Sequence, residues 1–247
     1  MKRFIEDSLK EWKEDKSRRP MILRGARQVG KSYLVSKRFA PSFKSFVVLD
    51  FEREPQLHSI FEDDLDARKI LSRIEVAKAQ KITPGETLLF FDEAQRCPRA
   101  LNALRYFYEE IPQLHLIAAG SLLQFALDTI SVPVGRVTYR YVTPLSFEEY
   151  LYNSGNQEIL TTIQKNWHSP IDPFVHQKAL ELLKEYFIIG GMPAAVAHYV
   201  ENRKLLAVKE IQQDLLQSFD TDIAKYTKKD ADYRNTCLLY TSPSPRD

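Results

Sequence analysis

The chain has 247 residues, a length that fits one large domain or one domain with an appendage. Its composition, 44% hydrophobic and 28% charged, is that of an ordinary globular protein, and a net charge of +2 is too small to indicate nucleic acid or an anionic membrane as a partner. The two cysteines, Cys97 and Cys237, provide no disulfide framework, and no apolar run approaches the ~20 residues needed to span a bilayer. We therefore expect a cytoplasmic protein that does not associate with a membrane.

Short apolar runs alternate with amphipathic stretches in the first part of the chain. The apolar runs predict strands buried on both faces, at residues 20–23, 46–49, 87–91, 114–119 and 137–142. The amphipathic stretches predict helices at residues 31–39, about 57–79, and 101–111. Strands that alternate with helices predict an α/β domain whose sheet is built from parallel βαβ units.

The pattern changes after Pro144. Helical patterns follow at residues 147–152, 176–188, 192–200 and 204–220, and no strand signal of comparable strength returns. Residues 153–173 are polar, and we expect a loop or an irregular helix connection there. We therefore predict an α/β domain at residues 1–145 and an all-helical region, a small lid with the start of a C-terminal region, at residues 146–236.

The last eleven residues read CLLYTSPSPRD, an apolar stretch that runs directly into Ser-Pro-Ser-Pro. This run is typical of translated adapter sequence at the end of an assembled gene, and a natural disordered tail is the alternative. We expect residues 237–247 to be a non-native tail. On that interpretation the native chain continues further, and a C-terminal domain is missing.

The segment GARQVGKS, from Gly25 to Ser32, fits the phosphate-binding pattern G-x-x-x-x-G-K-[ST]. Glycines allow a tight turn whose N–H groups surround a phosphate, and the following helix begins with its positive end toward the same group. Lys31 supplies a cation for the β- and γ-phosphates, and the Ser32 hydroxyl is a ligand for Mg²⁺. We expect the nucleotide to contact the whole loop: Gly25, Ala26, Arg27, Gln28, Val29, Gly30, Lys31, Ser32 and Tyr33. Arg27 could face nucleotide, another subunit or solvent.

Two acids follow the apolar run 88–91. Asp92, at the carboxyl end of a predicted strand, can reach the Mg²⁺ shell, and Glu93 can orient and deprotonate an attacking water. The alternative is an ordinary strand that leaves the core at a polar turn. Both acids together, sixty residues after a phosphate loop, favour a hydrolase over a phosphoryl-transfer kinase.

Two further residues are weaker candidates. Ser121 ends the fourth predicted strand, where it could hydrogen-bond the water or the γ-phosphate as a sensor; it could also serve only as a helix N-cap. Arg136 precedes the fifth strand, where it could stabilise transition-state charge in a neighbouring subunit; the alternative is an ordinary surface arginine. The pair Gly190-Gly191 fits a helix C-cap before a proline-initiated helix, or a lid turn near the nucleotide.

Six motifs occur in one order: RRPMILRGARQVGKSYL from Arg18, FFDEAQRCPRALNALR from Phe90, LIAAGSLL from Leu116, VGRV from Val134, PLSFEEYL from Pro144 and IIGGMP from Ile188. Through these motifs the chain resembles a prokaryotic family of AAA-type P-loop ATPases that is close to the signalling (STAND-like) ATPases. Members of this family carry a C-terminal domain of unknown function. The resemblance implies a three-layer sandwich with strand order 5-1-4-3-2, a helical lid, and ATP with Mg²⁺ as ligand. It assigns catalytic roles to Lys31, Glu93, Ser121 and, in trans, Arg136, and metal roles to Ser32 and Asp92.

Two functions remain open on this evidence. The first is Mg²⁺-dependent ATP binding and hydrolysis that couples nucleotide state to conformational change. The second is a nucleotide-gated signalling switch with little turnover of its own, which would use the same site. A trans-acting arginine would require a homo-oligomer, and neither a protein nor a DNA partner is favoured by the sequence.

Overall fold

The computed structural model describes residues 1–120, 135–166 and 168–227, with the backbone alone for 222–227. Ser121 and the predicted tail, residues 237–247, lie outside the described residues. The chain divides into two compact units, Met1–Ile171 and a second that begins at Asp172. Each unit is described by itself.

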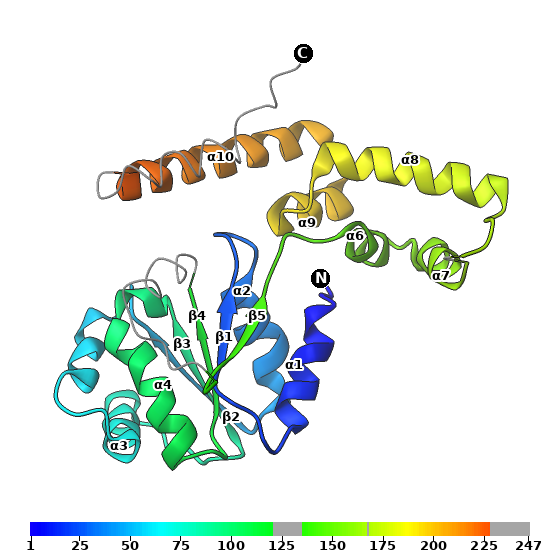
Figure 1. Ribbon diagram of the computed structural model, residues 1–247. Helices are drawn as coiled ribbons and strands as arrows, with labels where there is room; N and C mark the ends of the chain where they lie inside the picture. The colour runs from blue at the N-terminus through cyan, green and yellow to red at the C-terminus, as the bar shows by residue number, and fades with distance from the viewer. Residues whose placement is uncertain (121–134, 167, 228–247) are drawn as a thin grey trace. The chain divides into compact units, whose positions relative to one another are not determined.

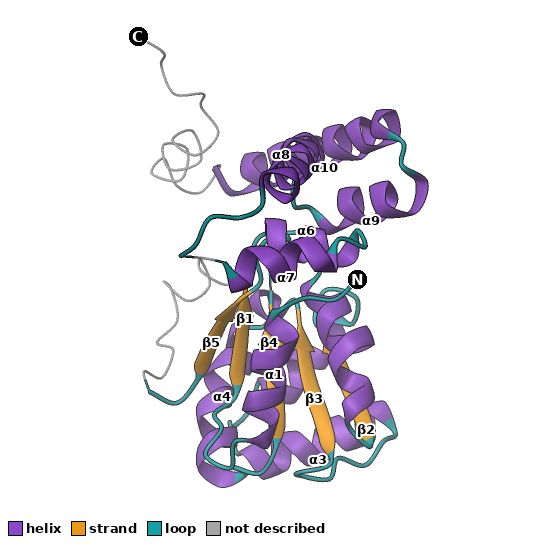
Figure 2. Ribbon diagram, turned by 90° about the vertical axis from the view of Figure 1, so that its right-hand side faces the viewer, coloured by secondary structure: helices purple, strands orange, loops and turns teal. Residues whose placement is uncertain are grey.

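A parallel five-stranded sheet forms the centre of the first unit (Figure 2). Its strands are β1 (Met21–Arg24), β2 (Ser45–Asp50), β3 (Thr87–Asp92), β4 (His115–Ala119) and β5 (Thr138–Tyr141). The order is β2-β3-β4-β1-β5, and every neighbouring pair is parallel. Read from the other edge, this is the expected order 5-1-4-3-2, so the predicted fold class is confirmed.

Helices cover both faces of the sheet (Figure 1). Successive strand side chains point to opposite faces, and in β3 Leu89 and Phe91 belong to a core cluster that includes α3 (Ala67–Lys78) and α4 (Pro98–Glu110). On the other face, Phe90 stacks on Phe46 with ring centroids 6.3 Å apart. Short 3₁₀ segments complete the connections, at Ala40–Ser42 (η2), Pro55–Phe61 (η3) and Ala94–Arg96 (η4).

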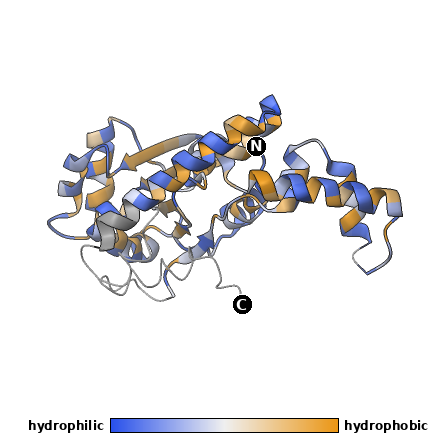
Figure 3. Ribbon diagram, turned by 90° about the horizontal axis from the view of Figure 1, so that it is seen from above, coloured by the Kyte–Doolittle hydropathy of each residue, from blue (hydrophilic) through white to orange (hydrophobic). Residues whose placement is uncertain are grey.

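The second face is covered by α1 (Ile5–Glu14) and by the helix that follows the phosphate loop, α2 (Lys31–Tyr33) continued by the π-helix η1 (Leu34–Phe39). Trp12 of α1 packs on Phe39 and, edge-on, on the ring of His115 in β4. Figure 3 shows orange, hydrophobic residues in the strands and both colours along the helices, as expected for helices with one buried face. Helix α1 was not predicted from the sequence.

The predicted helix at residues 57–79 is interrupted in the structure. Segment η3 ends at Phe61, and α3 begins only after Asp66, whose side chain accepts a hydrogen bond from the Lys69 N–H at 2.8 Å. An aspartate that caps a helix in this way has a non-helical backbone, so it begins a new helix and does not continue the previous one. Apolar spacing is similar on both sides of the break, which is why the pattern predicted one helix.

Helices α6 (Phe147–Asn153) and α7 (Gln157–Lys165) follow the sheet and belong to the first compact unit. The boundary predicted after residue 145 marks the end of the sheet, whereas the two compact units divide between Ile171 and Asp172. Long-range hydrogen bonds explain the difference, because Asn153 of α6 bonds to both backbone polar groups of Lys2. Helix α7 lies within the segment that was expected to be a loop or an irregular helix connection.

The second unit contains the predicted helices as α8 (Pro173–Ile189), α9 (Pro193–Asn202) and α10 (Leu205–Thr227). Gly190 ends α8 with a φ of 72°, and the Gln212 side chain donates to the carbonyls of Ile188 and Ile189, both at 2.9 Å. The described turn therefore has the C-cap and proline-initiated form. Across the described ranges, no helix is both long enough and apolar enough to cross a membrane.

Candidate functional site

The phosphate-loop sequence and the two acids meet at one edge of the sheet. The loop follows β1 and Asp92 ends β3, and the carboxyl ends of parallel strands lie at the same edge. Asp50 ends β2 and pairs in register with Asp92. The fold thus brings together side chains that are sixty residues apart in the sequence.

The loop has a backbone that only glycine can adopt at its first position. Gly25 has a φ of 146°, and a Cβ added there would lie 2.1 Å from the carbonyl oxygen of Val142. Gln28 and Gly30 also have positive φ values, 62° and 87°. These left-handed residues turn the chain tightly between β1 and α2, as expected of a loop whose N–H groups surround an anion.

Lys31 is the buried cation of the site. It is 7% exposed, and its Nζ donates to the carbonyls of Gly25 at 2.9 Å and Ala26 at 2.7 Å. Burial lowers the pKa of Lys31, whereas the charges of Glu93 and Asp92 raise it. The ammonium group is therefore held at the mouth of the loop between backbone carbonyls and two acids.

Ser32 and Asp92 are in direct contact. The Ser32 Oγ donates to Asp92 Oδ1 at 2.9 Å, and the Glu93 N–H donates to the same oxygen at 3.1 Å. Burial raises the pKa of Asp92, and these two hydrogen bonds oppose the rise. A hydroxyl and a carboxylate oxygen at this distance are the hard oxygen donors that Mg²⁺ prefers, so the residues present fit that ion.

Glu93 has an unusual backbone and an unexpected partner. Its φ and ψ are 48° and 42°, a left-handed conformation that is uncommon for a residue other than glycine, asparagine or aspartate. Its carboxylate accepts a hydrogen bond from Gln95 Nε2. Within the described part of the chain, the other polar atom of that side chain, Gln95 Oε1, is buried without a hydrogen-bond partner. Strain and an unmatched polar atom often accompany functional residues.

Sequence reasoning missed two residues of this edge, Gln95 and Asp50. Asp50 accepts hydrogen bonds from the N–H groups of Glu52 and Arg53, at 3.1 and 3.0 Å, and its charge helps raise the pKa of Asp92. The signal for Asp50 was present, because it follows an apolar run as Asp92 does. No sequence signal distinguishes Gln95 from a surface glutamine.

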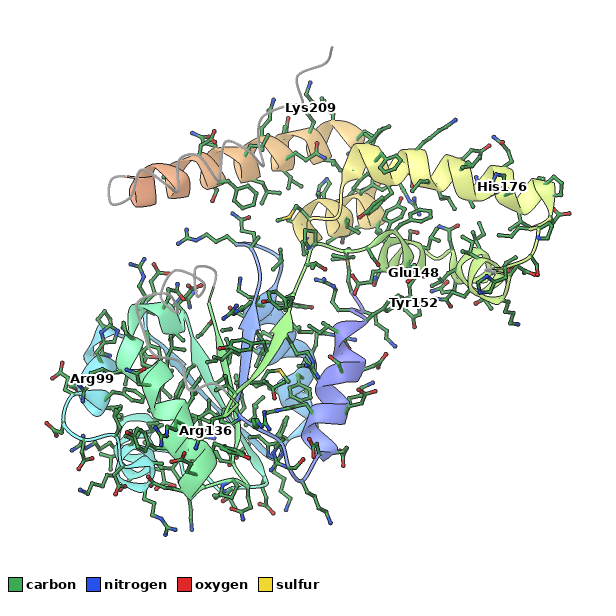
Figure 4. All side chains as sticks on the ribbon, viewed as in Figure 1. Arg99, Arg136, Glu148, Tyr152, His176 and Lys209 are labelled. Carbon is green, nitrogen blue, oxygen red and sulfur yellow. The ribbon has the colours of Figure 1, made fainter. Side chains whose placement is uncertain are left out.

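Arg136 lies far from the loop of its own chain. It precedes β5, at the amino end of the sheet, and its Nε donates to Glu109 Oε1 at 2.6 Å (Figure 4). Glu109 belongs to the last turn of α4 and also accepts from Arg105 at 3.0 Å. Within one chain, therefore, Arg136 does not meet the phosphate loop; the predicted role in trans remains a prediction.

The remaining predicted site residues belong to the loop and the start of α2, apart from Ser121, which lies outside the described residues. Ala26 and Val29 are in the loop, and both offer backbone carbonyls to buried cations. The charge of Arg27 lowers the pKa of Lys31, so this guanidinium lies within electrostatic range of the site. Tyr33 is exposed at the third residue of the helix.

Comparisons with known proteins agree with this geometry. Residues 17–151 match the AAA domain, and residues 180–243 match a domain of unknown function (DUF8612). The second match includes residues 237–243, which belong to the segment predicted to be a non-native tail. No curated protein sequence matches the chain.

Two solved structures resemble this chain to different degrees. The Walker-type ATPase of Pyrococcus abyssi is 16% identical, with a TM-score of 0.54, over 98% of this chain and 86% of its own. A STAND protein with a tetratricopeptide-repeat sensor from Pyrococcus horikoshii is 15% identical, over 78% of this chain and 29% of its own, with a TM-score of 0.41. At 16% identity, the likeness to the Pyrococcus abyssi protein concerns the fold alone. The family rests on the sequence match, which spans more than half of the chain and contains both the phosphate loop and Asp92: this chain belongs to the AAA domain family of P-loop ATPases.

Proposed function

We propose that this AAA domain binds ATP with Mg²⁺ at the loop Gly25–Ser32 and hydrolyses it to ADP and phosphate. The observation that carries the proposal is the contact between Ser32 and Asp92, with the Lys31 ammonium beside it at the same sheet edge. A lysine and a serine at the start of α2 and an aspartate at the end of β3 are the residue types that phosphoryl transfer in P-loop proteins uses.

The loop and Lys31 bind the phosphates. Loop N–H groups supply fixed donors, and the Lys31 ammonium can exchange its carbonyl acceptors, Gly25 and Ala26, for phosphate oxygens. A phosphate oxygen carries negative charge and attracts the Lys31 ammonium more strongly than a neutral carbonyl does, so this exchange favours binding.

Ser32 and Asp92 hold the metal ion. An Mg²⁺ ion held by these two oxygens would supply positive charge beside the phosphates of a bound nucleotide. Among residues 1–120, 135–166 and 168–227 no cluster of three or more histidine, cysteine or acidic side chains could hold a metal ion by itself. That agrees with Mg²⁺, which takes one or two protein ligands and completes its shell with phosphates and water.

Glu93 is the general base. Its carboxylate accepts the proton of the water that attacks the γ-phosphorus, as the bond between that phosphorus and the bridging oxygen breaks. Gln95 orients the carboxylate through its amide. Ser121 remains proposed as the sensor of the γ-phosphate, and Arg136 as a charge-stabilising residue supplied by a second copy in a homo-oligomer.

The second function is a switch that binds ATP tightly and turns over slowly, with nucleotide state read out as a conformational change. The Gln95 bond to Glu93 favours it, because the carboxylate already has a hydrogen-bond donor at the oxygen that would otherwise accept from a water. Steady-state phosphate release distinguishes the two functions. Hydrolysis predicts turnover that Glu93→Gln abolishes while ATP binding persists. The switch predicts tight binding without release, and faster release in Gln95→Ala.

The role of Arg136 in trans has its own test. Arg136→Ala removes an exposed ion pair with Glu109, and Glu109→Ala removes the same pair while the arginine stays. A trans-acting Arg136 predicts that only Arg136→Ala lowers the rate of phosphate release, with no change in the Kd for ATP. Equal effects of both variants would instead assign Arg136 to the ion pair.

A further inference from the structure

Arg3 and Glu149 form a buried ion pair that contacts the phosphate loop and includes none of the proposed catalytic residues. Arg3 and Glu149 are 8% and 5% exposed, and Arg3 Nε bonds to both carboxylate oxygens of Glu149, at 3.1 and 3.2 Å. The two residues are 146 positions apart, one before α1 and the other in α6. Burial of an ion pair seldom adds net stability, so the geometry of this pair requires another explanation.

The guanidinium of Arg3 joins three parts of the first unit. Its Nη1 donates to the carbonyl of Val29, in the phosphate loop, at 3.1 Å. Its Nη2 donates to the carbonyl of Thr143, in the segment that leaves β5, at 2.6 Å. The rigid fork of an arginine can hold acceptors in fixed relative positions, which a lysine cannot do.

The contact with Val29 fixes the direction of a loop N–H group. The peptide that joins Val29 to Gly30 is trans, so its carbonyl and its N–H point in opposite directions. When the carbonyl is held toward Arg3, the Gly30 N–H is held away from Arg3. The orientation of this donor is therefore set by a residue at the start of the chain.

The segment after β5 contacts the loop at a second point. A Cβ built on Gly25 would lie only 2.1 Å from the carbonyl oxygen of Val142. The Val142 N–H donates to the carbonyl of Arg24 at 2.8 Å. Val142 thus touches the first residue of the loop, while Thr143 is tied through Arg3 to Val29. A change in the loop's shape must move this segment or break these contacts.

Glu149 extends the connection into α6. Its two oxygens also accept from the N–H groups of Phe4 at 2.6 Å and Ser146 at 3.2 Å, the second as part of a capping box. One turn later, Tyr152 packs edge-on against Phe4 (Figure 4). The start of α6 and the residues before α1 therefore share one hydrogen-bonded network with the loop.

We propose that Arg3 is a positioning residue, which sets the Gly30 N–H for phosphate binding and couples the loop to α6 through Glu149. This proposal rests on the proposed function, because it assigns the bound phosphate to the same loop. Nucleotide binding then changes the protection of α6 backbone amides, and the change depends on Arg3.

The test compares MgATP binding and hydrogen exchange in the full chain and in matched variants. Arg3→Met with Glu149→Gln removes the fork without leaving a buried charge unpaired, and glutamine keeps the acceptor that a capping box needs. Arg3→Lys keeps the positive charge beside Glu149 and loses the fork. Lys78→Gln is the control, because it breaks a more exposed two-bond pair with Glu54 that contacts neither Arg3 nor the loop in the described contacts.

In the double variant, the Kd for MgATP is expected to rise about tenfold. This is the effect expected when one hydrogen bond to a charged phosphate is lost. The exchange of α6 amides is expected not to respond to MgATP. Arg3→Lys should fall between this variant and the wild type, and Lys78→Gln should match the wild type. Thermal unfolding checks that each variant is folded. A wild-type Kd in the folded double variant overturns the positioning role, and an unchanged α6 response overturns the coupling.

The proposed function fails in a different way from this inference. If it is wrong, the wild-type chain does not bind MgATP, or Lys31→Ala binds it equally well. If only the inference is wrong, the wild type binds MgATP, Lys31→Ala does not, and the double variant behaves as the wild type in both measurements.

Discussion

The hydroxyl of Ser32 donates to Asp92 Oδ1 at 2.9 Å, which joins the first turn after the phosphate loop to the end of β3. Two motifs separated by sixty residues thus come into direct contact. The sheet order makes this possible, since only β4 separates β1 from β3 and all three strands end at the same edge. The chemistry proposed for this domain depends on that adjacency.

Asp92→Asn should stabilise the nucleotide-free protein against unfolding and weaken the binding of Mg²⁺ with ATP. Burial holds the pKa of Asp92 above its usual range, so the charged form is disfavoured by folding and a neutral isostere removes that cost. Asparagine keeps an oxygen that can accept from Ser32 and from the Glu93 N–H. We expect Tm to rise by about 2–4 °C, the shift that 1 kcal/mol causes in a chain of this size.

The same variant should lose most of the additional stability that MgATP provides over ATP with EDTA. Thermal unfolding with each ligand measures this difference. Asp50→Asn is the matched control, because Asp50 ends the neighbouring strand and bonds only to backbone N–H groups and Arg53 in the described contacts. An Asp92→Asn protein with a wild-type Mg²⁺ effect would contradict the metal role of Asp92.

Gly25→Ala should be much more destabilising than Gly85→Ala. Both glycines have positive φ values, so both substitutions strain the backbone by about 1–2 kcal/mol. Only at Gly25 does the new Cβ meet another atom, the Val142 carbonyl oxygen at 2.1 Å, whereas nothing lies within 4 Å at Gly85. Overpacking adds about 1–3 kcal/mol.

Urea unfolding of the two glycine variants provides the comparison. We expect the free energy of unfolding to fall by about 2–5 kcal/mol for Gly25→Ala and about 1–2 kcal/mol for Gly85→Ala. Equal losses would show that the close approach of Val142 to the loop does not constrain the backbone.

His115 should make the fold sensitive to mild acid. The ring is buried against Trp12 and Phe43, and burial, with the charges of Arg18 and Lys13, lowers the pKa of His115 to about 4. The pKa in the unfolded chain is near 6.5, so the neutral ring favours folding at pH 7. That contribution is lost as the pH falls from 6.5 toward 4, and amounts to about 3 kcal/mol at most.

His115→Phe isolates this contribution, because a neutral aromatic ring can pack in the same place. We expect the fall in the free energy of unfolding between pH 7 and pH 4.5 to be smaller in the variant by about 2–3 kcal/mol. Exposed His176→Phe, in the second unit, serves as the control and should retain the wild-type dependence. If His115→Phe shows the same pH dependence as the wild type, another group is responsible.

The strands, and the residues that lie together at their carboxyl ends, could be predicted from the sequence because each has a local signal. Strands buried on both faces are continuous apolar runs, and the loop requires glycines at Gly25 and Gly30 whatever surrounds them. The acids were recognisable because Asp92 ends such a run. These features depend on neighbouring residues, which a sequence displays directly.

Features that depend on distant residues could not be predicted in this way. The contact between Arg3 and Glu149 spans 146 positions, and nothing near Arg3 distinguishes it from the other arginines. The hydrogen bond between Asn153 and Lys2 could not be predicted for the same reason. This bond connects α6 to the first unit. At Gln95 the spacing to Glu93 was visible, but the left-handed turn that brings the two side chains together was not.

The most direct test of the account is a calorimetric titration of the purified chain with MgATP, in the wild type and in Lys31→Ala. Loss of the buried ammonium removes the charge-assisted bonds to phosphate, so we expect the variant to bind at least about 100-fold more weakly. Lys37→Ala, an exposed lysine on the same helix, should bind as the wild type does. An unchanged Kd in a folded Lys31→Ala protein would contradict nucleotide binding at this loop.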